Sequence, residues 1–385
     1  MPDGKFLARD EVIATYRVRA EAQAIEARAQ AIALEQSIEL PLAAVSSAAL
    51  RDAVVGRVLA IEPSGEGAFD VRIGLAVATT GPEAGQLLNM LFGNTSIHDD
   101  VSLADAEFPP SVSAAFGGPR TGIKGLRRLA GDPARALTCA ALKPQGLAAD
   151  ELAALAGQLA LGGVDFIKDD HGLADQRYSP FADRVARCAD AIARAAGTTR
   201  AAGTIGRPTR YLPSLSGSLD ALRAQARAAQ NAGLAGVLVA PLIVGLASFH
   251  ALAREFPRLA FIAHPAMAGA ARIAPPFLLG RLFRLLGADA TIFPNYGGRF
   301  GYTPATCRAL ADAARAPWPG IRPTLPVAAG GMTPARVPEM LDFYGDEVML
   351  LIGGGLLLQR ERLTAATREF VQAVEAHAAA RERAG

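Results

Sequence analysis

The stretch LTCAALKPQGLAADELAALAGQLALGGVDFIKDDHG, residues 137–172, decides the fold that we expect for this chain. It opens with a short apolar segment, LTCAAL, and continues through a helix-like segment. It then reaches a second apolar segment, GVDFIK, which ends in charged residues. Alternation of short strands with helices is typical of parallel strand–helix units. This stretch therefore predicts a parallel α/β architecture.

The same pattern continues to the end of the sequence. The expected strands are LTCAAL (137–142), GVDFIK (163–168), RYLPSL (210–215), GVLVAPLIV (236–244), LAFIAH (259–264), ATIFPN (290–295), TLPVAA (324–329) and VMLLIG (348–353). Amphipathic segments such as SLDALRAQARAAQNAG (218–233) and TPATCRALADAARA (303–316) lie between them. About eight such units favour a closed (β/α)8 TIM barrel over an open sheet. We expect this barrel to span residues 134–385.

Residues 1–133 follow a different pattern. The segments YRVRA (16–20), VVGRVLAIEP (54–63) and FDVRIGLAVA (69–78) indicate antiparallel strands, and EAQAIEARAQAIALEQ (21–36) indicates a helix. We expect a ferredoxin-like α/β domain here. The glycine- and proline-rich segment SVSAAFGGPRTGIKG (111–125) is the expected hinge into the barrel.

Composition excludes several function classes. Hydrophobic residues make up 51% of the 385 residues and charged residues 20%, which is typical of a globular enzyme and not of a disordered chain. A formal net charge of +2 without a basic run argues against a nucleic-acid partner. The cysteines Cys139, Cys188 and Cys307 are scattered, which favours a reducing compartment.

Two features bear on membranes. The opening MPDGKFLARDE is too charged for a signal peptide, so we expect a cytoplasmic protein. Residues 228–253 contain no Asp, Glu, Lys or Arg and are long enough to span a bilayer. They also contain Pro241, His250 and several glycines, so we interpret them as the end of a helix, a buried strand and a new helix. No membrane partner is expected.

The segment GGVDFIKDDHG (162–172) carries the main chemical signal, because TIM-barrel active sites lie at the carboxyl ends of the strands. Alternate strand residues share a face, so Lys168 and Asp170 should point the same way. Carbamylation of Lys168 by CO2 would turn the cation into an oxygen-donating anion. With Asp170 it would offer two hard oxygen ligands to Mg²⁺. The simpler interpretation is a salt-bridged strand end or a charged turn.

The same segment resembles the signature of the RuBisCO large-chain family, in which a glycine pair precedes Asp-Phe and Lys-Asp-Asp-Glu follows. The resemblance implies that Lys168 is carbamylated and that Lys168, Asp170 and His171 hold Mg²⁺. His171 stands where the family has glutamate. Its softer, uncharged imidazole would admit Mn²⁺ or another transition ion, or His171 would act instead as an acid or base.

Two further strand ends resemble the family. In ALKPQG, Lys143 matches a lysine that carries protons in the family, whereas Gln145 replaces the lysine that supports carboxylation. In IAHPAM, His264 matches a family histidine, whereas Pro265 replaces the arginine that grips a second phosphate. A salt-bridged rim lysine and a hydrogen-bonded core histidine are the simpler interpretations of Lys143 and His264.

Two glycine runs end the last two expected strands. VAAGGM contains Gly330 and Gly331, and LIGGGLL contains Gly353 and Gly354. Exposed backbone N–H groups at such loops bind phosphate, and glycine lets the anion approach closely. The resemblance implies a cradle for one phosphate. Ala329 replaces a serine that helps at the other end, and a pair of tight turns is the simpler interpretation.

Three more residues are expected to contact substrate. Arg299, in the loop PNYGGRFGY, lies where the family has a mobile lid, and we expect it to clamp an anion unless it is a solvated loop charge. In the first domain, Glu35 and Asn94 resemble family residues that reach the site of a neighbouring subunit. The resemblance therefore implies a homodimer or a dimer-based oligomer.

These departures share a pattern. Gln145, Pro265 and Ala329 remove features that a bisphosphate carboxylase needs, while the metal ligands, Lys143 and one phosphate cradle remain. We therefore expect a RuBisCO-like protein (type IV) that forms an enolate of a monophosphorylated keto-sugar or keto-acid.

Several activities stay open. We lean to decarboxylation of a 3-oxo sugar-acid phosphate, of the 3-oxo-isoapionate 4-phosphate type, because Arg299 offers a cationic clamp for a second anion and the sequence shows no obvious thioether pocket. The alternatives are an enolase or isomerase of a methylthio-keto-sugar phosphate, as in methionine salvage, and a non-catalytic sugar-phosphate binding protein, which His171 would support. A barrel aldolase or epimerase with a Schiff base at Lys143 is a further alternative that needs no metal.

Overall fold

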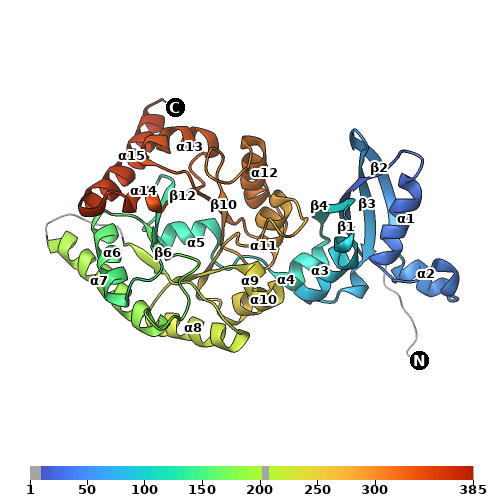
Figure 1. The fold of residues 1–385 in the computed structure, drawn as a ribbon, viewed down its shortest axis with the longest axis horizontal. Coiled ribbons are helices and arrows are strands. Elements are labelled where there is room, and N and C mark those ends of the chain that lie inside the picture. The colour runs from blue at the N-terminus through green and yellow to red at the C-terminus, as the bar shows by residue number, and fades with distance from the viewer. Residues whose placement is uncertain (1–9, 202–207, 385) are drawn as a thin grey trace. The chain divides into compact units, whose positions relative to one another are not determined.

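The computed structural model describes residues 10–201 and 208–384, which form two compact units (Figure 1). One unit comprises the described chain up to Gly117, with Met267–Leu278 and Pro319–Ile321. The other comprises the remaining described residues. Residues 118–133, which we assigned to the first domain on sequence, therefore lie in the second unit. Residues 1–9, with most of the charged opening segment, lie outside the described residues.

The first unit is built on a four-stranded antiparallel sheet in the order β2-β3-β1-β4. Its strands are β1 (Glu11–Arg19), β2 (Arg57–Gly65), β3 (Ala68–Ala76) and β4 (Val101–Glu107), and its helices are α1 (Ile25–Glu35), α2 (Ala48–Val54), α3 (Ala84–Phe92) and α4 (Pro110–Phe116). Every second residue of β1 is buried, so one face of the strand is apolar. Two β-α-β repeats in this order make the predicted ferredoxin-like fold, although β4 was not among the expected strands.

The second unit is a parallel eight-stranded barrel in the order β7-β6-β5-β12-β11-β10-β9-β8. The strands are β5 (Leu137–Leu142), β6 (Phe166–Asp169), β7 (Arg210–Leu212), β8 (Gly236–Val239), β9 (Ala260–Ala263), β10 (Ala290–Pro294), β11 (Leu325–Ala329) and β12 (Met349–Ile352). A parallel bridge between Ser214 and Leu238 joins the two ends of the order. The predicted TIM barrel is confirmed.

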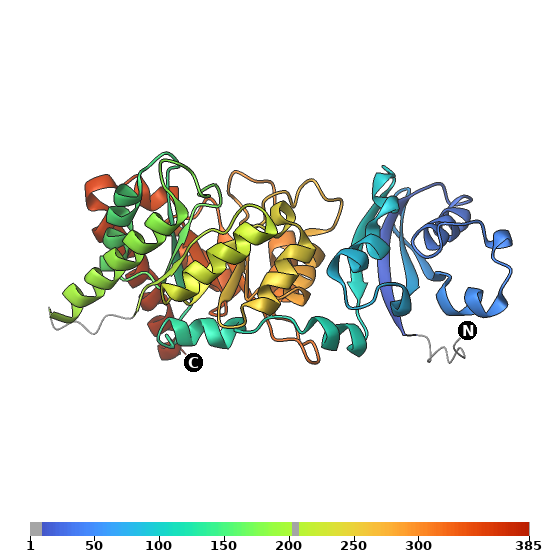
Figure 2. The same ribbon diagram turned by 90° about the horizontal axis from the view of Figure 1, so that it is seen from below.

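Helices surround these strands (Figures 1 and 2). They are α5 (Gly122–Leu129), α6 (Ala149–Leu161), α7 (Phe181–Ala201), α8 (Leu219–Asn231), α9 (Pro241–Val244), α10 (Leu246–Glu255), α11 (Phe283–Leu285), α12 (Pro304–Arg315), α13 (Val337–Tyr344), α14 (Gly354–Leu357) and α15 (Leu363–Ala384), with a π-helix over Pro276–Leu282. The expected strand 236–244 was too long, because Pro241 starts helix α9. Across the described ranges, no helix is long and apolar enough to cross a membrane.

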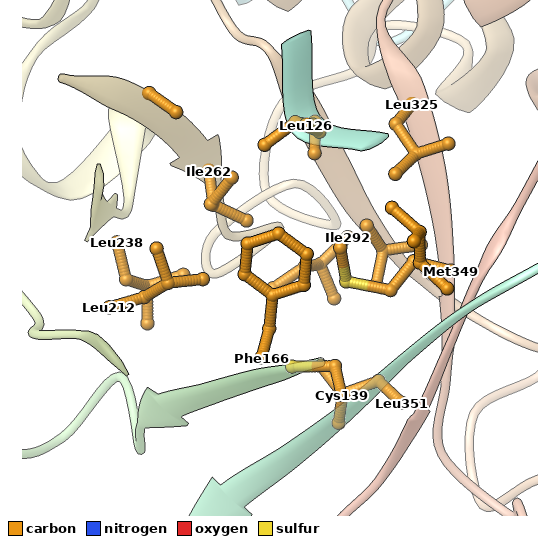
Figure 3. Close-up of a cluster of buried hydrophobic side chains, with 14 of the residues drawn as sticks. Leu126, Cys139, Phe166, Leu212, Leu238, Ile262, Ile292, Leu325, Met349 and Leu351 are labelled. Carbon is orange, nitrogen blue, oxygen red and sulfur yellow. The ribbon is translucent and has the colours of Figure 1, made fainter. Parts of the chain in front are cut away.

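Apolar side chains fill the barrel (Figure 3). Alternate residues of each strand point inward, so Cys139 and Ala141 of β5 lie inside, as do Ala260 and Ile262 of β9. Phe166 is the inward residue at the start of β6. The same alternation carries the next positions along each strand to the carboxyl end of the barrel.

Helix α5 closes the opposite end. Its buried side chains Ile123 and Leu126 belong to the barrel core, and Leu126 lies beside the inward-facing strand residues in Figure 3. The buried carboxylate of Asp289, just before β10, accepts hydrogen bonds from the backbone N–H groups of Thr121 and Gly122, at 2.7 Å each. Since Asp289 precedes its strand, α5 lies at the amino-terminal ends of the strands.

Truncating a buried side chain of helix α5, which closes the amino-terminal end of the barrel, should destabilise the barrel. Leu126 is fully buried, so Leu126→Ala should lower the free energy of unfolding by about 3 kcal/mol through lost burial and a residual cavity. The only tryptophan in the sequence, Trp318, lies in the barrel unit, so its fluorescence during urea denaturation reports on that unit. Leu358, which is 80% exposed in the same unit, is the control. Equal free energies of unfolding for Leu126→Ala and Leu358→Ala would contradict the role of helix α5 in closing the barrel.

Candidate active site

The charged residues at the end of β6 lie on two different faces of the strand. Phe166 points into the barrel, so Lys168 and Asp170 follow it on the inner side. Ile167 and Asp169 point outward by the same alternation. The pairing of Lys168 with Ala141 of β5 fixes this register at the carboxyl end of the barrel. The sequence prediction that Lys168 and Asp170 share a face agrees with this geometry.

Asp169 anchors the strand end from outside. Its buried carboxylate accepts hydrogen bonds from Arg184 Nε (3.0 Å), Tyr211 Oη (2.7 Å) and the backbone N–H of Ser214 (3.0 Å). The side chains of Arg184 and Asp169 are both fully buried. Helix α7, β7 and the loop after β7 are thereby fastened to β6. This group was not predicted from the sequence, because nothing in the local pattern around Arg184 or Tyr211 points to Asp169.

Lys168 is a buried amine. Its residue is 4% exposed, and its Nζ donates a hydrogen bond to the backbone carbonyl of Asp169 at 2.7 Å. Burial lowers the pKa of Lys168, and the nearby positive charge of Lys143 lowers it further, while Cys139 and Asp170 oppose the change. The amine is therefore held toward its uncharged form, which is the form that reacts with CO2.

Lys143 and Asp170 form an ion pair beside it. The Nζ of Lys143 lies 2.7 Å from Oδ1 of Asp170. Burial alone would raise the pKa of Asp170, but hydrogen bonds from His171 and Lys143 and the charge of Lys168 bring it well below its usual value. A Cβ added at Gly353 would lie 3.7 Å from Cε of Lys143. The second glycine run thus begins next to this pair.

Two histidines complete the inner cluster. The rings of His171 and His264 are stacked, with centroids 4.1 Å apart and planes inclined by 12°. Nδ1 of His171 lies 3.3 Å from Oδ1 of Asp170. Nδ1 of His264 accepts a hydrogen bond from the backbone N–H of Ala266 at 3.1 Å, so its proton sits on Nε2 in the neutral form. Burial, aided by the charge of Lys168, lowers the pKa of His264 to about 2. His264 is therefore a neutral hydrogen-bond donor.

The donor set fits a hard divalent ion once Lys168 carries a carbamate. Within residues 10–201 and 208–384, no three His, Cys, Asp or Glu side chains gather in a way that could hold a metal ion. Asp170 and His171 offer an ionised carboxylate and an imidazole. A carbamate on Lys168 would be the third ligand, and its oxygens are of the kind that Mg²⁺ prefers.

The first glycine run packs against the loop after β10. Gly330 and Gly331 have φ values of 84° and 65°, in the left-handed region that glycine adopts without strain. A Cβ at Gly331 would lie 2.6 Å from Cα of Gly298. Two neighbouring residues of this loop differ in their surroundings: Gly298 lies against the glycine run, whereas Arg299 is exposed, with its guanidinium 5.0 Å from the ring centroid of Phe300.

The two predicted site residues of the first unit lie together. Asn94 Nδ2 donates hydrogen bonds to Glu35 Oε1 at 2.9 Å and to Glu39 Oε1 at 3.0 Å. The buried amide of Gln36 holds this corner, because Oε1 accepts from the backbone N–H of Thr95 and Nε2 donates to backbone carbonyls of α3. Glu39 was missed on sequence; the short spacing to Glu35 was its only signal.

Removing the anchor of Asp169 should be far more costly than removing a surface ion pair. Arg184→Met leaves a buried carboxylate without its cation, and we expect the free energy of unfolding to fall by about 3–5 kcal/mol. Arg187→Met, on the same helix, breaks an exposed pair with Asp150 and should cost about 1 kcal/mol or less. Urea denaturation followed by Trp318 fluorescence measures both. Similar losses for the two variants would contradict the anchoring role.

Comparison with known proteins agrees with this arrangement. Residues 122–384 match the family described as ribulose bisphosphate carboxylase large chain, catalytic domain. The chain is 57% identical over 366 residues to a 5-methylthioribulose-1-phosphate isomerase of Rhodospirillum rubrum, covering 95% of this chain and 96% of that protein. It is 31% identical over 397 residues to a 2,3-diketo-5-methylthiopentyl-1-phosphate enolase of Geobacillus kaustophilus, covering 96% and 93%.

A solved structure shows the same likeness. The crystal structure of a Rubisco-like protein from Rhodopseudomonas palustris matches with a TM-score of 0.88 at 51% identity, over 96% of this chain and 98% of that chain. From the sequence we predicted a RuBisCO-like enzyme that is a lyase or an isomerase or enolase. The names of these relatives, an isomerase and an enolase, confirm an enzyme of this family. The chain therefore belongs to the RuBisCO large-chain family and is a RuBisCO-like protein.

Proposed function

We propose that this protein isomerises a methylthio-ketopentose phosphate of the 5-methylthioribulose 1-phosphate type by enolate chemistry at the mouth of the barrel. The observation that carries the proposal is the Lys143–Asp170 pair at 2.7 Å, next to the buried amine of Lys168. The relative with 57% identity, whose name gives this activity, supports the choice of substrate.

Isomerisation of a ketose phosphate moves one proton from a hydroxyl-bearing carbon to the neighbouring carbonyl carbon, and a second proton from that hydroxyl to the carbonyl oxygen. In our proposal, Nζ of Lys143 carries the proton from one carbon to the other, while Asp170 positions Lys143. Nε2–H of His264 donates a hydrogen bond to an oxygen of the substrate. Mg²⁺, when bound, supplies positive charge that favours enolate formation.

The remaining expected residues take supporting roles in this proposal. Carbamylated Lys168, Asp170 and His171 would hold Mg²⁺, with Mn²⁺ as a substitute. The phosphate would bind backbone N–H groups of the two glycine runs, Gly330, Gly331, Gly353 and Gly354. Glu35 and Asn94, which already share a hydrogen bond, would contact substrate bound to the partner subunit of a homodimer in the cytoplasm.

The decarboxylase that we favoured on sequence has lost its main support. It depended on Arg299 as a clamp for a second anion, and that guanidinium is exposed and lies over Phe300. The relatives' names give an isomerase and an enolase, which fit the alternative better. A non-catalytic binding protein stays as the competing hypothesis, because His171 replaces the family's glutamate.

Substrate turnover in D2O tests the activity. With Mg²⁺ and bicarbonate, the protein should convert 5-methylthioribulose 1-phosphate to an isomer, with some deuterium entering at a carbon near the carbonyl, as followed by proton and phosphorus NMR. Loss of the proton carrier in Lys143→Met should slow turnover by about 10²–10⁴-fold. Arg299→Met should change it by less than about threefold, since Arg299 lies over Phe300.

The other outcomes separate the competing hypotheses. Loss of CO2 from 3-oxo sugar-acid phosphates, without isomerisation of the methylthio compound, would restore the decarboxylase. Sugar phosphates that raise the melting temperature without any exchange or turnover would favour the binding protein. Borohydride trapping of Lys143 with substrate would favour the Schiff-base enzyme.

Metal binding should depend on CO2. Without the carbamate, the site offers only Asp170 and His171, so Mn²⁺ affinity measured by electron paramagnetic resonance should rise at least about tenfold when bicarbonate is added. Lys168→Met should abolish that rise, and Lys143→Met should retain it. After chelation, activity should return only with Mg²⁺ and bicarbonate together. A Mn²⁺ affinity that does not change when bicarbonate is added would contradict carbamylation of Lys168.

A further inference from the structure

We propose that a second, previously unassigned site at the closed end of the barrel binds a small molecule carrying two or more phosphate groups. The site is a cavity of about 430 Å³ beside helix α5. Its described lining residues are Arg120, Thr121, Gly122, Ile123, Lys124, Arg128, Arg322 and Pro323. Four of them are cationic and none is acidic, so the cavity concentrates positive potential in a chain whose net charge is only +2.

The local fold places the cationic residues around the cavity. Lys124 and Arg128 lie four residues apart on α5, so they share one face of the helix. Arg322 comes from the loop before β11, and its Nη1 donates to the backbone carbonyls of Pro119 and Arg120 at 3.2 Å. Like charges at this spacing on a helix repel each other, and a bound polyanion would remove that penalty.

Side chains would hold the ligand. The N–H groups of Thr121 and Gly122 at the start of α5 are already bound to Asp289. The four cationic residues are exposed, so their long side chains can reach an anion in the cavity. Guanidinium groups suit phosphate because they present paired donors in one plane.

A second surface cavity shows that arginine alone does not produce such a site. The groove between α6 and α7, about 530 Å³, is lined by Arg187 and Arg194 but also by Asp150 and Asp190. Arg187 is paired with Asp150. Charge is therefore balanced among the residues that line that groove, whereas the cavity beside α5 is lined by four cationic residues and no acidic one.

The location separates this site from the catalytic one. Helix α5 lies at the amino-terminal ends of the strands, whereas Lys143, Lys168 and His264 lie at their carboxyl ends. A polyphosphate at α5 would therefore not compete with substrate. The inference is independent of the proposed isomerase activity.

Calorimetric titration with inorganic tripolyphosphate tests the inference on the full-length protein. We expect binding that weakens as salt is raised, because exposed charges are screened. Lys124→Glu/Arg128→Glu should weaken it at least about tenfold, and Lys124→Ala by a smaller factor. Arg187→Glu/Arg194→Glu, in the balanced groove, makes the same change in net charge as the double variant and should bind like the wild type.

Two results would contradict a polyphosphate site beside α5. If tripolyphosphate does not bind the wild type, the inference is wrong. If it binds Lys124→Glu/Arg128→Glu with unchanged affinity, the anion sits elsewhere, as at the glycine runs, and the inference is also wrong. Circular dichroism melting verifies that each variant is folded, and Lys124→Ala gives a milder test if the double variant is not.

Discussion

The alternation of faces at the end of β6 is the constraint on which the rest of the site depends. It buries the amine of Lys168 inside the barrel and sends Asp169 outward, where Arg184, Tyr211 and the backbone of Ser214 hold it. An amine in this position is stripped of water, and only a carbonyl oxygen accepts its hydrogen bond in the described structure. Burial lowers the pKa of Lys168, in the direction of the uncharged form that reaction with CO2 requires.

Several side chains around the site depart from the pattern that the family resemblance implies. Gln145 stands where the family resemblance leads one to expect a second lysine, and its amide lies so close to Gly172 that a Cβ there would overlap it. Pro265 carries no charge beside His264, and Arg299 lies over Phe300. Lys143 at the barrel mouth is paired with Asp170.

Sequence patterns predicted the features that depend on local periodicity. Two-residue alternation placed Lys168 and Asp170 on one face, and repeated strand–helix units predicted the barrel. Features that depend on distant contacts were not predicted. Strand β4 has a mixed burial pattern and pairs with β1 far along the chain. Asp169 meets Arg184 and Tyr211 only after folding, and the split of GVLVAPLIV into β8 and α9 depends on Pro241.

The most direct test of the central claim is a ¹³C NMR spectrum of the protein equilibrated with ¹³C-bicarbonate and Mg²⁺. If burial holds Lys168 in its reactive form, one slowly exchanging carbamate resonance should appear and should vanish in Lys168→Met, while Lys143→Met retains it. A spectrum without a carbamate resonance, or one that persists in Lys168→Met, would contradict the account.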